Sequence, residues 1–147
     1  RAGMDDYEKL NEVLVQLFND TLEVERKYVE KSRFRDISVN DMHILEAIGI
    51  DGAKSMSAIA KLVGVTVGTL TIAVNSLVKK GYVIRTRSEK DRRVVLVTLS
   101  EKGRAAYACH KEFHNDILQA MRKGLDDDQC RILIQAMTNL RDHFLTI

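Results

Sequence analysis

The sequence predicts a mainly α-helical protein with one small β-hairpin. Apolar residues recur at spacings of three and four near both ends of the 147-residue chain, which contains no proline to break its helices. Between these stretches, residues 81–99 hold two short β-prone runs on either side of a charged turn, a pattern typical of a hairpin. A chain of this length is expected to form one domain with its own core, covering residues 4–147. Residues 1–3, which precede Met4, are interpreted as the remnant of a cleaved tag.

A long amphipathic helix is predicted over residues 5–30. Its polar and apolar residues separate onto opposite faces, and the apolar stripe consists of Leu10, Val13, Leu14, Leu17, Phe18, Leu22, Tyr28 and Val29.

The centre of the chain, residues 38–99, predicts two shorter helices joined by a glycine turn. Ser55 can cap a helix over residues 56–62, and Gly64 ends it because glycine adopts the left-handed conformation at little cost. Thr66 can cap a second helix over residues 67–80, which is followed by Gly81. Its buried stripe is Leu70, Val74, Leu77 and Val78. Its other face carries small, hydrogen-bonding or β-branched side chains: Gly68, Thr69, Thr71, Ile72, Asn75, Ser76 and Lys79.

The hairpin that follows is strongly basic. Its strands are expected at residues 82–86 and 94–99. Residues 79–93 contain two acidic side chains, Glu89 and Asp91, against seven basic ones: Lys79, Lys80, Arg85, Arg87, Lys90, Arg92 and Arg93. A net charge of +5 here contrasts with +2 for the whole chain and suits a polyphosphate partner, although a solvated turn is the alternative. Helix, glycine turn, helix and basic hairpin together predict a winged helix-turn-helix that binds double-stranded DNA.

The outward face of the second short helix is the predicted reading surface for DNA bases. Gly68, Thr69, Thr71, Ile72 and Asn75 are candidates for contacts with base edges, whereas Thr66, Ser76 and Lys79 are candidates for phosphate contacts. The hairpin contributes Arg85, Arg87, Lys90, Asp91, Arg92 and Arg93, with its tip in the adjacent minor groove. We expect Asp91 to hold one of the two neighbouring arginines and leave the other for DNA; strand alternation does not decide which.

The helices after the hairpin are predicted to complete a dimerisation region. Ser100 can cap a helix that runs to about Lys123, and Asp126 with Gln129 forms a capping-box pattern before the last helix. The first of these helices is expected to turn Tyr107, Phe113, Ile117, Leu118 and Met121 inward. Residues 4–36 and 100–147 carry more apolar surface than the central region can cover, so a homodimer is predicted. Two-fold symmetry would place the reading helices roughly 34 Å apart on a palindromic operator.

Several runs resemble the MarR family of transcriptional regulators. They are Lys80-Gly81-Tyr82-Val83-Ile84-Arg85, Asp91-Arg92-Arg93, and Val97-Thr98-Leu99-Ser100-Glu101-Lys102-Gly103. Within that family the chain is most similar to FabT-type repressors of fatty-acid synthesis genes, through residues 32–38, 41–43, 87–95 and the pair His110-x-x-Phe113-His114. The resemblance implies a dimer in which Arg92 inserts into the minor groove while Asp91 and Arg93 fix the tip. It also implies an effector, acyl carrier protein bearing a long acyl chain, which strengthens DNA binding.

A second basic cluster lies at the end of the first predicted helix. It comprises Arg26, Lys27, Lys31, Arg33 and Arg35, opposed by Glu30. The resemblance makes it a candidate docking patch for the acidic acyl carrier protein. A solvated helix end or further phosphate contacts are the alternatives.

Four residues suggest a zinc site. His110 and His114 stand one helical turn apart, Glu25 falls at a position of the first helix's stripe where an apolar residue is expected, and His43 adjoins Met42. Three imidazoles and one carboxylate fit tetrahedral zinc. Zinc-responsive repressors of the MarR family use a similar set, but their second, sulfur-containing site is not found in this sequence. The alternative is that these side chains hydrogen-bond within the core or line the effector pocket while neutral.

The sequence argues against an enzyme. It has no HExxH motif, no nucleophile elbow and no phosphate-binding glycine loop. A winged-helix interaction module that does not bind DNA is the remaining alternative. Cys109 and Cys130 lack partner spacing, and no apolar run has the length of a membrane span, so a cytoplasmic location is expected.

Overall fold

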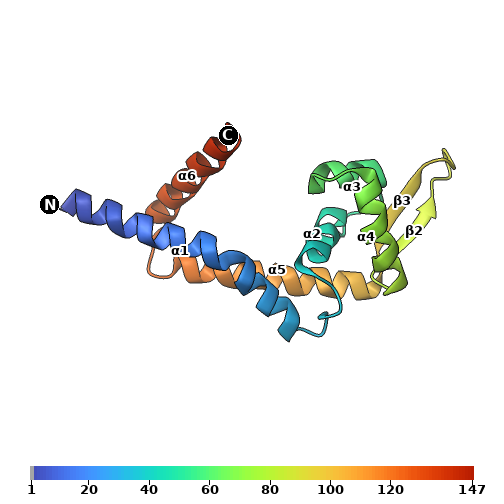
Figure 1. Ribbon diagram of the computed structural model, residues 1–147, viewed down its shortest axis with the longest axis horizontal. Helices are drawn as coiled ribbons and strands as arrows, with labels where there is room; N and C mark the ends of the chain where they lie inside the picture. Colours follow the sequence, from blue (N-terminus) through green and yellow to red (C-terminus); the bar gives the residue numbers. More distant parts are fainter. Residues whose placement is uncertain (1) are drawn as a thin grey trace. The chain divides into compact units, whose positions relative to one another are not determined.

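The computed structural model describes residues 2–147, with side chains from Asp5 onward. The predicted tag remnant, residues 1–3, lies outside the residues whose side chains are described. The elements confirm a mainly helical fold with a small sheet, and Figure 1 labels all of them except β1. They are α1 (Ala2–Lys31), α2 (Val39–Ile48), β1 (Lys54–Ser55), α3 (Met56–Val63), α4 (Val67–Lys79), β2 (Val83–Arg87), β3 (Val95–Leu99), α5 (Glu101–Arg122) and α6 (Asp127–Phe144).

The chain divides into two compact units, residues 1–110 and residues 111–147, with the boundary inside α5. The first unit contains the helix-turn-helix and the hairpin. Its core includes Leu70, Val74 and Leu77 of α4, which are fully buried as predicted, while Val78 is only partly buried.

The helix boundaries follow the predicted caps closely. The Ser55 and Thr66 hydroxyls each accept a hydrogen bond from the backbone N–H three residues later, at the start of α3 and α4. Gly64 ends α3 with a φ of +81°, the left-handed conformation that favours glycine. At the start of α6, Asp126 and Gln129 form the expected capping box.

The sheet is antiparallel with strand order β1–β3–β2. The predicted hairpin is confirmed, with the pairing running from Val83 opposite Leu99 to Arg87 opposite Val95. The third strand, β1, pairs Lys54 with Val97 and was not predicted. Its two residues are too few to show any alternation of polar and apolar side chains.

The base of the hairpin packs closely on α5. A Cβ atom added at Gly103 would lie 2.1 Å from the carbonyl oxygen of Tyr82, so only glycine fits at this crossing. The Ser100 hydroxyl donates to the carbonyl of Gly81 at 2.5 Å and accepts from the backbone N–H of Gly103 at 3.1 Å. These contacts fix where the hairpin leaves the core.

Tyr82 also ties the hairpin to the segment between α1 and α2. Its buried hydroxyl donates to Asp36 Oδ1 at 2.5 Å, and Lys80 Nζ donates to the backbone carbonyl of Asp36 at 2.6 Å. Burial, followed by the hydrogen bond to Asp36, raises the pKa of Tyr82. The same hydrogen bond from Tyr82 is the main cause that lowers the pKa of Asp36.

The terminal helices expose much of their predicted apolar stripes. In α1, Leu10, Leu17 and Leu22 are 66%, 57% and 72% exposed. The expectation that Ile117, Leu118 and Met121 point inward is wrong for the single chain, where their exposures are 41%, 56% and 37%. Helix α6 buries none of its residues.

No single helix within residues 2–147 combines the length and hydropathy needed to cross a bilayer. Only the pair α3 and α4, bent by 105° at the turn between them, meets those criteria when taken together.

Candidate nucleic-acid interface

Helix α4 presents the polar face that the sequence predicted. Gly68, Thr69, Asn75, Ser76 and Lys79 are exposed and Thr71 is partly exposed. Ile72 is 75% exposed, which is unusual for a large aliphatic side chain on a helix whose opposite face is fully buried. All the predicted base-reading residues therefore lie on the accessible side of α4.

Helix α4 is bonded to the hairpin through its outward face. The Arg85 guanidinium of β2 donates a hydrogen bond from Nη1 to Oδ1 of Asn75. In Figure 1, α4 lies beside β2. A recess of about 430 Å³ is lined by residues of α3, α4, β2 and β3: Met56, Thr71, Arg85, Thr86, Arg87 and Val95. The bond joins α4 to the wing, the β2–β3 hairpin.

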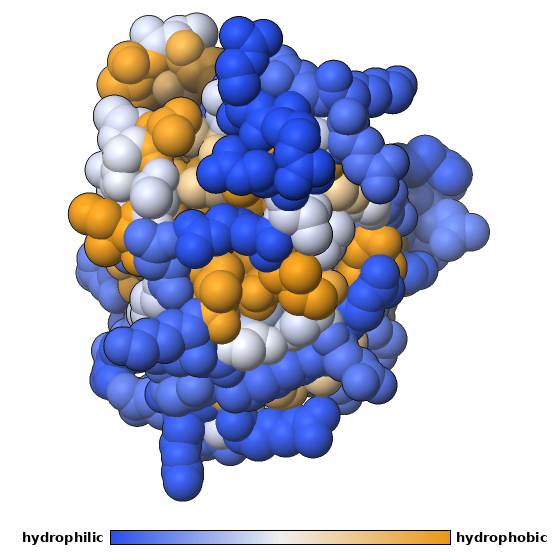
Figure 2. Space-filling view, turned by 90° about the vertical axis from the view of Figure 1, so that its right-hand side faces the viewer, coloured by the Kyte–Doolittle hydropathy of each residue, from blue (hydrophilic) through white to orange (hydrophobic). Residues whose placement is uncertain are grey.

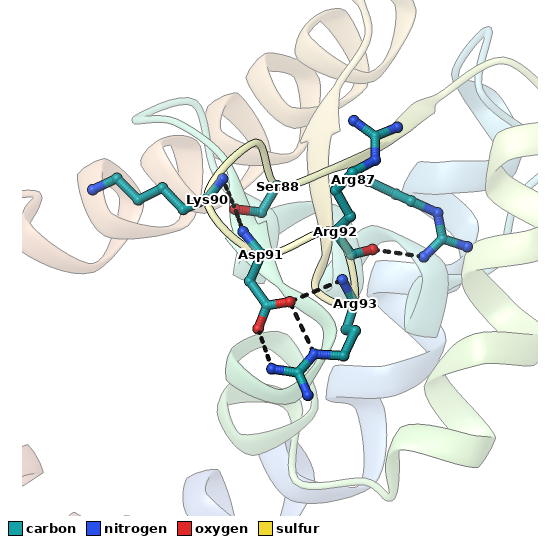
Figure 3. A network of polar contacts seen from close by, with 6 residues as sticks. All are labelled: Arg87, Ser88, Lys90, Asp91, Arg92 and Arg93. Atoms are coloured by element: carbon teal, nitrogen blue, oxygen red, sulfur yellow. Dashed lines mark hydrogen bonds and ion pairs between the residues drawn. The ribbon is translucent and has the colours of Figure 1, made fainter.

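The tip of the wing is ordered by Asp91 (Figure 3). Its Oδ1 accepts hydrogen bonds from Arg93 Nε at 3.0 Å and from the Arg93 backbone N–H at 3.1 Å, and its Oδ2 accepts from Arg93 Nη2 at 3.1 Å. The Arg93 side chain is the main cause that lowers the pKa of Asp91, and the same bonds raise the pKa of Arg93. The carboxylate therefore neutralises one arginine of the tip.

The neighbouring arginine has a different environment. Figure 3 shows the Arg92 guanidinium pointing away from the Asp91–Arg93 pair, and the Arg92 residue is exposed. Its backbone carbonyl accepts a hydrogen bond from Arg87 Nη1 at 2.9 Å. The Ser88 hydroxyl oxygen accepts from the backbone N–H of Lys90 at 3.2 Å, which further rigidifies the turn. The tip thus presents Arg92 on a fixed backbone.

The side of the molecule that carries α4 and the wing in Figure 1 is largely hydrophilic, interrupted by separate hydrophobic patches (Figure 2). The wing side chains Arg85, Arg87, Lys90, Arg92 and Arg93 are all exposed. A concentrated cationic edge beside a helix face whose only charge is Lys79 in its last turn can bind phosphates while the helix approaches the bases.

The second basic cluster is less positive than its sequence suggested. Arg26 donates to Glu23 Oε1 at 2.5 Å and also pairs with Glu30, so two carboxylates oppose its charge. Glu23 was not counted in the prediction, although its spacing of three residues from Arg26 on a helix signals such a pair. Lys27, Lys31, Arg33 and Arg35 are exposed, and the Arg33 guanidinium lies 5.0 Å from the ring centroid of Phe34.

A recess of about 470 Å³ adjoins this cluster. Its apolar wall comes from Leu22 and Val29 of α1, Ile37 in the segment before α2, and Val39 at the start of α2. The rest of the lining is Arg26, Glu30, Arg35, Ser38 and Asn40. The first unit thus places cationic side chains at the rim of a partly apolar hollow.

Three of the four residues predicted to bind zinc come together. His43 Nε2 lies 2.8 Å from Glu25 Oε1, and His110 Nε2 lies 3.6 Å from Glu25 Oε2. One potential ligand atom from each of these residues lies within 4.8 Å of the others. Glu25 and His110 are buried, whereas the His43 side chain is 45% exposed. His114 belongs to the second unit, residues 111–147.

Sequence reasoning missed Glu46 in this cluster. Its Oε2 lies 2.7 Å from His110 Nδ1, so carboxylates face both nitrogens of that ring. The spacing of three residues between His43 and Glu46 on α2 places them on one face and could have indicated it.

The fold and this surface define a winged helix-turn-helix domain of the nucleic-acid-binding type. A sequence profile of the MarR family matches residues 35–94. The crystal structure of Streptococcus pneumoniae FabT in complex with DNA is 36% identical, covers 95% of this chain and 98% of that chain, and has a TM-score of 0.85. The chain belongs to the MarR family, whose members are transcriptional regulators and not enzymes.

Other relatives are more distant or match a shorter stretch. The apo form of wild-type MarR from E. coli is 25% identical over 89% of this chain and 95% of that chain, with a TM-score of 0.66. The HTH-type transcriptional regulator SarZ of Staphylococcus aureus (strain USA300) is 35% identical over 83 residues, which are 56% of each protein. The chain therefore spans about half the length of the curated relatives it matches.

Proposed function

We propose that this protein is a sequence-specific DNA-binding repressor that acts as a homodimer in the cytoplasm. The observation that carries the proposal is the pairing of an uncharged, exposed reading face on α4 with a cationic wing, joined by the Arg85–Asn75 hydrogen bond. Phosphate contacts from the wing would supply affinity, and α4 would supply sequence discrimination. The match to FabT, which was crystallised with DNA, supports the same role.

The exposed apolar residues of the terminal helices support the homodimer. Ile132, Ile134 and Met137 of α6 are 69%, 64% and 51% exposed, and the stripe of α1 is similarly uncovered. Burial of such residues against a second copy would be favourable at about 25 cal/mol for each Å² of apolar surface. A two-fold dimer would bind a palindromic operator with its reading helices roughly 34 Å apart.

The decisive experiment is selection of bound sequences from random DNA, followed by fluorescence polarisation with the recovered duplex. We expect Arg92→Ala to lower affinity at least tenfold and to reduce the slope of log affinity against log salt by about one unit per subunit. Lys123→Ala, which removes an exposed cation in the turn before α6, is the control and should leave both quantities unchanged. Failure to recover any site would favour an interaction module that does not bind DNA.

The regulated genes are proposed to be those of fatty-acid or lipid synthesis, with acyl-acyl carrier protein or a related apolar ligand as effector. The resemblance to FabT over nearly the whole chain supports this, as does the cationic rim around the recess bounded by Leu22, Val29 and Ile37. A long acyl chain requires an apolar wall, and an acidic carrier requires cations beside it.

This part of the proposal is tested by adding acyl carrier protein, with and without a long acyl chain, to the DNA complex. The acylated form should tighten DNA binding, and the double variant Lys27→Glu with Lys31→Glu should lose that effect while binding DNA alone as before. Tightening that survives the charge reversal would exclude the basic cluster as the docking site. Equal responses to the acylated and free carriers would exclude acyl-chain sensing.

A second candidate function is zinc sensing, and one observation favours it: Glu25, His43 and His110 converge from α1, α2 and α5. Imidazole and carboxylate are ordinary zinc ligands, and His114 was predicted as the fourth. Elemental analysis of protein purified without chelator should find about one zinc per chain, lost in His110→Asn. Less than about a tenth of an equivalent, with no shift in Tm on adding zinc, would leave these residues as a hydrogen-bonded network that includes Glu46.

A further inference from the structure

Ile72 lies at the centre of the exposed face of α4. Its neighbours one helical turn away are Gly68 and Thr69 on one side and Asn75 and Ser76 on the other, so it is surrounded by small polar or hydrogen-bonding residues. At 75% exposed, it is the most exposed hydrophobic residue of α4, and its β-branched side chain is not favoured by helix propensity. Neither local packing nor helix stability accounts for isoleucine at this position.

The threonine hydroxyls around Ile72 are directed toward the helix itself. Thr71 Oγ1 donates to the carbonyl of Val67 at 2.8 Å, and the Thr66 hydroxyl donates to Thr69 Oγ1 at 3.0 Å. A hydroxyl bonded within the protein is less available to a partner than one without such a bond.

Gly68 leaves space beside Ile72. A Cβ atom added there would have Thr66 Oγ1, at 3.9 Å, as its nearest neighbour, and the residue lies inside a regular helix. The fold therefore does not require glycine at this position. A missing side chain on an exposed face allows a partner to approach the helix backbone closely.

Asn75 supplies a hydrogen-bond donor on the same face. Arg85 donates to Asn75 Oδ1, and since a guanidinium has only donors, the amide oxygen must face it and the NH₂ group is directed elsewhere. Asn75 is exposed and stands three residues after Ile72, so the two side chains share one face of α4. An apolar group beside a donor is a specific chemical pattern.

From this pattern we infer that Ile72 and Asn75 read thymine. In the major groove thymine alone presents a methyl group together with an acceptor, O4, whereas cytosine presents a donor and guanine presents two acceptors without a methyl. Ile72 contacts the thymine C5-methyl and the Asn75 NH₂ donates to O4, while Gly68 allows the base edge to approach. The inference rests on the proposed DNA-binding function and names the base that α4 recognises.

The test replaces each thymine of the selected operator by uracil, which removes only the methyl group. At the thymine contacted by Ile72 we expect about a fourfold loss of affinity, the factor for one buried methyl. In Ile72→Ala the same replacement should have no effect. Alanine is the better helix former and position 72 is exposed, so this variant is expected to fold. Leu62→Ala, which truncates a 65% exposed residue of α3, is the matched control and should keep the fourfold difference.

A repeated selection with Asn75→Asp tests the donor, because the carboxylate accepts but cannot donate a hydrogen bond. We expect the preference for thymine at the affected position to disappear. If selection with the unchanged protein recovers no site, the proposed function itself fails. If a site is recovered but uracil has no effect anywhere, or has the same effect with Ile72→Ala, DNA binding stands and the thymine assignment is overturned. An unchanged preference in Asn75→Asp would remove Asn75 from the assignment.

Discussion

Replacement of Gly68 by alanine should change stability and DNA affinity in opposite directions. The added methyl group meets no atom closer than Thr66 Oγ1, at 3.9 Å, and the backbone of Gly68 is already helical. Alanine reduces the conformational entropy of the unfolded chain and is favoured within helices by 0.5–1 kcal/mol. Because Gly68 lies in the first turn of α4, we expect about 0.5 kcal/mol of added stability, equivalent to a rise in Tm of about 1–2 °C.

The same methyl group should weaken DNA binding. Extra volume in a closely packed contact typically costs about 1–3 kcal/mol, so a loss of affinity of about tenfold is expected if a base edge approaches Gly68. Urea or thermal unfolding measures the first effect, and fluorescence polarisation with the selected operator measures the second. Since the fold becomes more stable, reduced binding cannot be attributed to unfolding.

Gly64 provides the matched control. An added Cβ at Gly64 has no neighbour within 4 Å, but the φ of +81° makes any L-residue unfavourable. Gly64→Ala should therefore lose about 1 kcal/mol of stability through the backbone alone. A Gly68→Ala variant that is less stable, or that binds the operator as tightly as the unchanged protein, would refute the reasoning about the reading face.

Four further outcomes are expected. Gly103→Ala should lower Tm strongly, because its methyl would lie 2.1 Å from the Tyr82 carbonyl oxygen, and an unchanged Tm would show that α5 can shift. Tyr82 has a raised pKa in the folded state, so the free energy of unfolding should fall as pH rises above about 10. Urea unfolding should show a smaller fall in Tyr82→Phe, which has no hydroxyl to ionise. Asp36 has a lowered pKa, so the stability that its carboxylate contributes should be present above about pH 4 and be lost on acidification. The variant Asp36→Asn should not show this loss of stability at low pH. Arg93→Ala should weaken operator binding less than Arg92→Ala, because Asp91 already pairs with Arg93; the reverse order in polarisation assays would contradict it.

The parts of the fold that were predicted well depend on residues near one another in sequence. Thr66 caps α4 through a bond three residues away, Gly64 ends α3 through its own backbone conformation, and Asp126 with Gln129 caps α6. The hairpin strands also began and ended close to the predicted residues because the charged turn lies directly between them. Local hydrogen bonds and propensities determine all of these features.

The features that sequence reasoning missed depend on distant partners. Glu46 joins His110 across a separation of 64 residues, and Tyr82 bonds Asp36 across 46. The spacing on α2 can place Glu46 on the face of His43, but nothing in either segment identifies His110 as the partner of Glu46 or Asp36 as the partner of Tyr82. The inward direction of Ile117 and Met121 was predicted from an apolar stripe. Such a stripe identifies a helix face that is expected to be buried, but it does not distinguish burial within one chain from burial against a second copy.

Charge is distributed unequally between the two elements proposed to contact DNA. Helix α4 carries a single charged residue, Lys79, in its last turn, whereas the wing has five exposed basic side chains and uses Asp91 to hold one of them. Phosphate contacts weaken with salt in proportion to their number, while contacts with base edges do not. Wing substitutions should therefore change the salt slope and weaken all DNA sequences alike. Uncharged substitutions at Ile72 or Asn75 should alter which sequence is preferred while leaving the slope unchanged. One pair of salt titrations can therefore separate the contribution of α4 from that of the wing.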